Sequence, residues 1–158
     1  MAIEEHDRED LLRDGRTMAV RGELVLDGVT IVIGFRRQGQ FSLYWGADRV
    51  FQFDESQQLR RVYLDGRKYA AESGELIELT RPTRGGRVEL TRQGVDESTT
   101  STIVDTISGT LSRLSAIISD KESEWSTVGA SDADFHDRVI GWLQTIPSPL
   151  QIGSKANA

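Results

Sequence analysis

The chain has 158 residues, of which 37% are hydrophobic and 28% are charged, and it contains no cysteine. This composition is sufficient for one hydrophobic core, and it excludes a disulfide framework and thiol chemistry. The formal net charge is −6, and the sequence pI of about 5.0 argues against nucleic acid as a partner. The longest uncharged apolar run, Val29 to Phe35, has seven residues. A membrane-spanning helix needs about 20, so we expect no membrane contact.

The N-terminal residues predict a short surface helix. Residues 3–14 are mostly charged, with Ile3, Leu11 and Leu12 as the large apolar side chains, and Gly15 can end a helix. This acidic start lacks the apolar stretch of a signal peptide. Together with the absence of cysteine, it favours the cytoplasm as the location.

Between residues 17 and 92, apolar and polar side chains alternate with a period of two, which is typical of strands with one buried face. Asp27-Gly28 and Asp65-Gly66 are two-residue hairpin signals. The pattern predicts strands at residues 19–26, 29–35, 41–45, 50–53, 59–64, 68–71, 76–80 and 87–92. These predict an antiparallel β-meander of about six to eight strands, which must cover its apolar face by curling into a barrel-like sheet or by packing a helix against it.

Two amphipathic segments follow the strands. Residues 99–121 carry apolar residues at spacings of three and four, which predicts a helix, and Gly109 in its middle indicates a close approach to the sheet or a kink. A second helix is predicted to begin at Ser131 and to end before Pro147. We therefore expect an α+β fold over residues 1–146, with both helices packed on the sheet and a flexible tail over residues 147–158.

The aromatic residues of the strands are candidates for lining a ligand cavity. They fall on the inward-facing positions of the predicted strands, as do core residues. A closed barrel would turn them toward an enclosed space that could hold a small apolar ligand, with or without catalysis. The candidate lining residues are Phe35, Phe41, Trp45 and Phe53.

Arginine dominates the basic residues, with 16 arginines against three lysines, and residues 36–92 carry a net charge of +3 between acidic ends. Guanidinium groups bind carboxylate and phosphate in a bidentate manner, and arginine with aromatic side chains on a sheet can bind single-stranded nucleic acid. Glutamates in the same region can pair with these arginines, which gives an ordinary mixed-charge surface. The candidate anion-binding residues are Arg60, Arg61, Arg67 and Arg84.

The sequence contains no recognisable catalytic or metal motif. The acidic residues around His136 begin a predicted helix, where they offset the helix dipole, so we expect no metal and no cofactor. No Gly-x-Ser-x-Gly elbow is present. The leading prediction is a non-enzymatic binding or interaction module for a small ligand or a protein partner. The alternatives are an apolar-ligand barrel, an anion or single-stranded nucleic-acid binder, and a homodimer.

Overall fold

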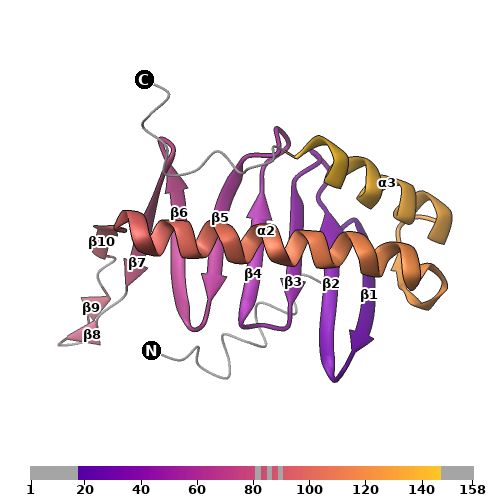
Figure 1. Cartoon of the computed structure of the whole chain (residues 1–158), viewed down its shortest axis with the longest axis horizontal. Coiled ribbons are helices and arrows are strands. Elements are labelled where there is room, and N and C mark those ends of the chain that lie inside the picture. The colour runs from indigo at the N-terminus through magenta and orange to yellow at the C-terminus, as the bar shows by residue number, and fades with distance from the viewer. Residues whose placement is uncertain (1–17, 81–82, 85–86, 89–90, 147–158) are drawn as a thin grey trace.

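The computed structural model describes residues 18–80, 83–84, 87–88 and 91–146, with the backbone alone for 83–84 and 87–88 (Figure 1). The predicted N-terminal helix and the predicted C-terminal tail lie outside the described residues. The described part is an α+β structure in which a nine-stranded antiparallel sheet carries two α-helices.

The sheet is a meander in which neighbours in sequence are neighbours in space, with one added strand at the end next to β1. The strand order is β10-β7-β6-β5-β4-β3-β2-β1-β11, and every pairing is antiparallel. The strands are β1 (Val20–Leu26), β2 (Val29–Phe35), β3 (Phe41–Trp45), β4 (Arg49–Phe53), β5 (Leu59–Leu64), β6 (Arg67–Glu72), β7 (Glu75–Thr80), β10 (Thr91–Gly94) and β11 (Ser126–Val128).

The hairpin turns form where the sequence predicts them. Asp27 and Gly28 both have positive φ, of 52° and 79°, and Asp65 and Gly66 repeat this geometry at 51° and 83°. Two positive φ values in a two-residue loop match the right-handed twist of the flanking strands. The two Asp-Gly predictions are therefore confirmed.

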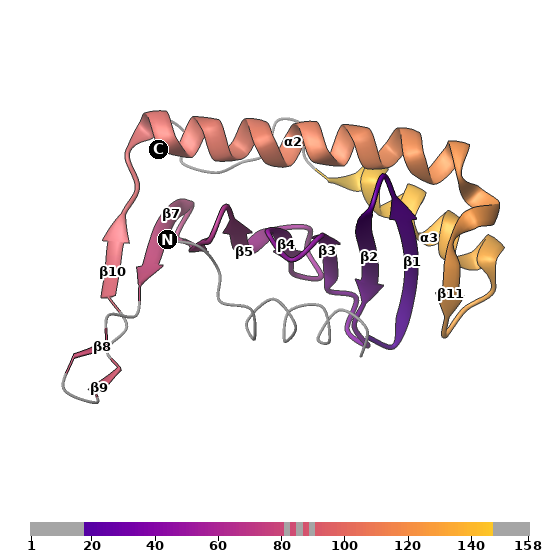
Figure 2. The same cartoon turned by 90° about the horizontal axis from the view of Figure 1, so that it is seen from below.

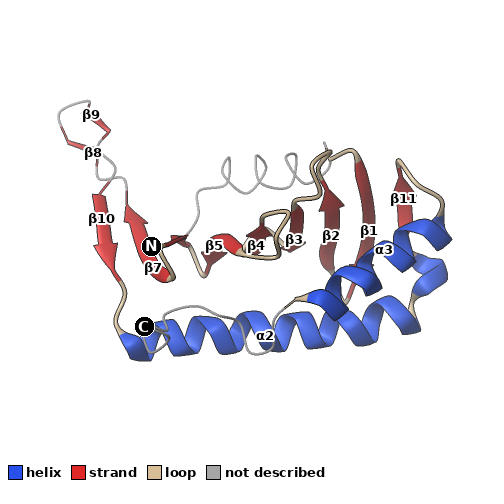
Figure 3. Cartoon of the chain, turned by 90° about the horizontal axis from the view of Figure 1, so that it is seen from above, coloured by secondary structure: helices blue, strands red, loops and turns tan. Residues whose placement is uncertain are grey.

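Both helices lie on one side of the sheet (Figures 2 and 3). The long helix α2 (Glu97–Asp120) runs across the strands, and α3 (Asp132–Thr145) covers the end of the sheet near β1, after a short 3-10 helix, η1 (Glu122–Glu124). Asp96 caps α2 by accepting a hydrogen bond from Thr99 N at 2.7 Å. Ser131 caps α3 by accepting from Asp134 N at 3.2 Å, as its sequence position predicts.

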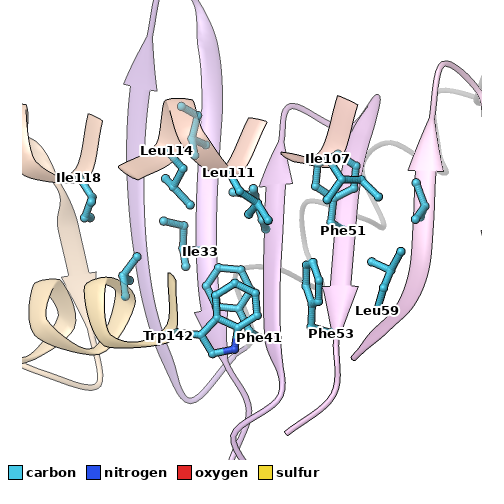
Figure 4. Packing of buried hydrophobic residues seen from close by; sticks show 14 of the residues in the cluster. Ile33, Phe41, Phe51, Phe53, Leu59, Ile107, Leu111, Leu114, Ile118 and Trp142 are labelled. Atoms are coloured by element: carbon cyan, nitrogen blue, oxygen red, sulfur yellow. The ribbon is translucent and has the colours of Figure 1, made fainter. Parts of the chain in front are cut away.

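The main core fills the space between the sheet and the helices, on what we call the helix side. Phe41 stacks on Trp142 of α3 with ring centroids 3.7 Å apart, and Phe53 meets the same indole edge-on at 4.9 Å (Figure 4). The apolar stripe of α2 faces this layer, and its fully buried members are Ile107, Leu114 and Ile118. Burial of this stripe compensates for the weak helix propensity of the serines and threonines in α2.

The opposite face of the sheet, which we call the far side, carries a smaller cluster. Val32, Tyr44 and Val50 are fully buried there, and Met18 packs against Gly34 of β2. A Cβ atom on Gly34 would lie 2.0 Å from Met18 Sδ, so the glycine makes room for the methionine.

Three predictions need correction, and one strand of the structure was not predicted. The sheet does not close into a barrel: it is open, with β10 and β11 as its edge strands in the described chain, because the helices cover its apolar face instead. The predicted strand over residues 87–92 is divided between β9 (Arg87–Val88), which pairs with β8 (Thr83–Arg84), and β10. Gly109 is exposed and nothing lies within 4 Å of a Cβ built on it, so it makes no close approach to the sheet. β11 has no counterpart among the predicted strands.

Candidate functional site

An open polar pocket of about 440 Å³ lies at the end of the sheet where β2 and β4 end and β3 and β5 begin. This volume falls within the range of small-molecule sites, which is roughly 300–1,000 Å³. The described residues that line it are Arg36, Gln40, Ser42, Gln52, Phe53, Asp54, Glu55 and Arg60. The pocket therefore combines two cations, two carboxylates and three neutral polar side chains.

The floor of the pocket comes from the central strands β3 and β4. Ser42 and Gln52 are directly opposed in the antiparallel register, so both side chains point to the far side. Gln52 Nε2 donates to the hydroxyl of buried Tyr44 at 3.2 Å, which fixes the direction of the amide. Ser42 lines the same floor, with 2% of the residue exposed.

A β-bulge places Arg60 in the wall of the pocket. Gln52 pairs with Arg61 and Phe53 pairs with Leu59, so Arg60 is the extra residue on β5. Bulges commonly redirect a side chain at the end of a strand. No described acidic side chain forms an ion pair with Arg60.

The acidic residues of the pocket come from the turn that joins β4 to β5. Asp54 Oδ1 accepts hydrogen bonds from Ser56 N at 2.8 Å and from Gln58 N at 3.0 Å, so this carboxylate is committed to its own turn. Glu55 is exposed at the rim. Neither acid neutralises Arg60 through an ion pair among the described residues.

The aromatic residues selected from the sequence lie on the helix side. Phe35, Phe41 and Phe53 are buried in the main core, where Phe41 meets the other two rings edge-on. Trp45 is half-buried at the rim of the core, under the guanidinium of Arg113 at 5.4 Å. The rings thus pack against each other and against the helices, and Phe53 alone also lines the polar pocket.

The arginines selected from the sequence are dispersed. Arg60 lines the pocket, and Arg61, opposite Gln52, is exposed on the far side. Arg67 lies on the helix side and forms an ion pair with Glu78 at 3.4 Å. The side chain of Arg84 lies outside the described part of the chain. The structure therefore does not bring Arg60 and Arg67 together.

Tyr69 of β6 pairs with Glu78 of β7 in the antiparallel register, and the pKa of its phenol is raised. Burial of the phenol has the largest effect, and the negative charge of Glu78 adds to it. Both disfavour the phenolate. The tyrosine faces the main core and lies apart from the polar pocket, so this shift reflects packing rather than a reactive group.

The candidate residues from the sequence include only Phe53 and Arg60 of the pocket lining. The lining residues that they omit are Arg36, Gln40, Ser42, Gln52, Asp54 and Glu55. Ser42 and Gln52 do leave a signal: they are polar residues on strands whose other positions are almost entirely apolar. The register that places them side by side emerges only in the folded sheet.

Other classes of site receive no support from the described residues. They contain no group of three histidine or acidic side chains arranged to hold a metal ion. Neither of their helices is long and apolar enough to cross a membrane. Comparison with protein-family models, with curated proteins and with solved structures gives no match. The function must therefore be inferred from the geometry of the pocket.

Proposed function

We propose that this protein is a non-enzymatic binding module that takes a small, polar, carboxylate-bearing molecule in the polar pocket. Arg60 would bind the carboxylate. The neutral polar groups of Ser42 and Gln52 would bind the remainder of the ligand. One observation supports this most directly: the Arg60 guanidinium stands beside a serine and a glutamine without a described acidic partner.

The charges of the pocket favour a carboxylate over a more highly charged ligand. Arg36 takes part in another interaction, whereas Arg60 forms no ion pair with a described acidic side chain. Asp54 and Glu55 stand on the same rim and repel a dianion. A monoanion with hydrogen-bonding groups matches both the guanidinium and the neutral floor.

A titration followed by NMR tests the proposal. Acetate and lactate, both monoanions at neutral pH, are the carboxylate probes, and inorganic phosphate is the comparison, all at constant ionic strength. We expect saturable shifts of the backbone amides of Ser42, Gln52 and Arg60. Losing a hydrogen bond to a charged group costs about 1.5–3 kcal/mol, so Arg60→Gln should weaken carboxylate binding by about ten-fold or more.

The matched control is Arg37→Gln. Arg37 is exposed and follows Arg36 directly, but it does not line the pocket. Arg37→Gln removes the same charge from a residue whose neighbour in sequence, Arg36, lines the pocket. Equal weakening in the two variants would show that only the general charge attracts the anion. Absence of saturable shifts at the three amides would also contradict the proposal.

A further inference from the structure

A second arrangement of arginines lies on the helix side, away from the polar pocket. It is formed by Trp45 of β3, Arg49 of β4, and Thr110 and Arg113 of α2. Arg49 Nη1 donates to Thr110 Oγ1 at 3.1 Å, and Arg113 Cζ lies 5.4 Å from the centre of the Trp45 ring. Two guanidiniums are thus held by neighbouring groups.

The fold brings these groups together from both layers. Tyr44 pairs with Val50, so one step further along the antiparallel register Trp45 lies beside Arg49 on the helix side. On α2, Thr110 and Arg113 are three residues apart and share one side of the helix. The arginine bonded to Thr110 and the arginine over Trp45 therefore lie near each other on the helix side of the sheet.

The hydrogen bonds fix the direction of the Arg49 side chain. Thr110 donates its hydroxyl proton to the carbonyl of Thr106 at 2.7 Å, so its oxygen is left to accept from Arg49. Arg49 uses one N–H in this bond. Arg113 is exposed, its guanidinium lies over the Trp45 ring, and it forms no ion pair with a described acidic side chain.

No described acidic side chain neutralises this pair. The ion pairs of the described residues involve Arg67, Arg92, Lys121 and His136, and they include neither Arg49 nor Arg113. Two cations at one rim repel each other, and an anion between them would turn repulsion into attraction. Guanidinium forks match the geometry of phosphate and carboxylate oxygens.

We propose that Arg49 and Arg113 form a second binding site, for a phosphate group. The combined charge of two arginines favours a dianion, as in a phosphate monoester or inorganic phosphate, over a monoanionic carboxylate. Thr110 and Trp45 orient the two guanidiniums before the ligand arrives, which reduces the cost of ordering them. This site is independent of the proposed function of the polar pocket.

The chain supplies a matched control on its other helix. Arg138 of α3 stacks on Phe35 with Cζ 5.5 Å from the ring centre, nearly the same geometry as Arg113 on Trp45. Among the described residues, no arginine hydrogen-bonded to a threonine accompanies Arg138 as Arg49 accompanies Arg113. A site that needs two guanidiniums should depend on Arg113 and not on Arg138.

The experiment is a titration with inorganic phosphate, phenyl phosphate and acetate at constant ionic strength, monitored through the arginine Nε–H and Trp45 indole N–H signals. We expect saturable shifts of Arg49, Arg113 and Trp45 with both phosphates and weaker binding of acetate. Arg49→Gln and Arg113→Gln should each weaken phosphate binding by about ten-fold or more. Arg113→Lys keeps the positive charge but lacks the forked guanidinium, so it should retain part of the phosphate affinity. Tighter binding of phenyl phosphate than of inorganic phosphate would identify an ester as the preferred source.

Arg138→Gln and Arg60→Gln should leave phosphate binding unchanged. If Arg138→Gln weakened phosphate binding as much as Arg113→Gln does, the proposal would be overturned, because any exposed arginine would then contribute equally to phosphate binding. A loss in Arg60→Gln would likewise show that phosphate occupies the polar pocket. Arg113 is exposed, so its variants should fold, and an unchanged amide spectrum elsewhere in the chain verifies this. Absence of saturable phosphate binding to the folded wild type would also overturn the site.

Discussion

Gly22 of β1 lies directly under the ring of Phe135 of α3, and a Cβ atom built on the glycine would stand 2.3 Å from Phe135 Cζ. The absence of a side chain at position 22 thus sets how closely α3 approaches the sheet. Phe135 is 1% exposed and also contacts Trp125, with ring centroids 5.8 Å apart. The ring is enclosed on several sides, so it has little freedom to move away.

Gly22→Ala should therefore destabilise the protein. The backbone of Gly22 has no positive φ, so alanine is compatible with the strand and the whole cost is steric. Overpacking of a filled core costs typically about 1–3 kcal/mol. Urea unfolding followed by circular dichroism measures this cost. An unchanged free energy of unfolding would mean that α3 shifts outward without loss.

Gly109→Ala should have the opposite effect. Gly109 is in the middle of α2, exposed, with nothing within 4 Å of a Cβ built there. Glycine costs a helix roughly 0.5–1 kcal/mol relative to alanine, so the substitution should raise the free energy of unfolding by a similar amount. Thermal unfolding at several protein concentrations is the measurement. A destabilisation would reveal a contact with another molecule on this side of α2.

Two substitutions of Trp142, which stacks on Phe41, can separate the effect of ring packing from that of its buried N–H. Trp142 Nε1 is buried and has no hydrogen-bond partner among the described residues, so the indole is stabilised by its ring contacts and destabilised by desolvation of its N–H. Trp142→Ala should cost about 3–5 kcal/mol. Trp142→Phe keeps an aromatic ring against Phe41 and removes the unpaired N–H, so it should cost much less. Urea unfolding measures both variants. An equal decrease in the free energy of unfolding would contradict the prediction that ring packing, and not the indole N–H, stabilises the core at position 142.

Much of the sheet is predictable from the sequence because its signals are local. Alternation of apolar residues and the two Asp-Gly turns define strands over most of residues 20–80, and the amphipathic stripe defines α2. Closure of the sheet is not local, since it depends on whether a helix or another strand covers the apolar face. β11 has only three residues, too few for a period of two to be visible.

The polar pocket is harder to predict because a β-bulge interrupts the alternation of side chains between the two faces of the sheet along β5. Strict alternation puts Leu59 on the same side as Arg61. In the structure Leu59 lies in the main core with Val62 and Leu64. Arg60 is the inserted residue that makes this possible. Arg60 was therefore selected for its charge, but its neighbours Ser42 and Gln52 come from strands whose register the sequence does not specify.

The N-cap of α2 should make part of the stability depend on pH. The pKa of Asp96 is lowered from its ordinary value of 3.8 because the carboxylate accepts a hydrogen bond from Thr99 N. A carboxyl with a lower pKa in the folded state stabilises fully above 3.8, and this contribution is lost as the pH falls through the folded value. Asp96→Ala should thus lower Tm at neutral pH, and the difference from wild type should shrink in acid.

Ser131→Ala is the matched control for this prediction. Ser131 caps α3 with a hydroxyl that does not titrate, and it accepts from Asp134 N in the same position of its helix. Its substitution should lower Tm by an amount that changes much less with pH. Thermal unfolding of wild type and both variants across the acid range makes the comparison. If the Asp96→Ala difference stayed constant to well below 3.8, the charge of Asp96 would contribute nothing, and the cap would act through hydrogen-bond geometry alone.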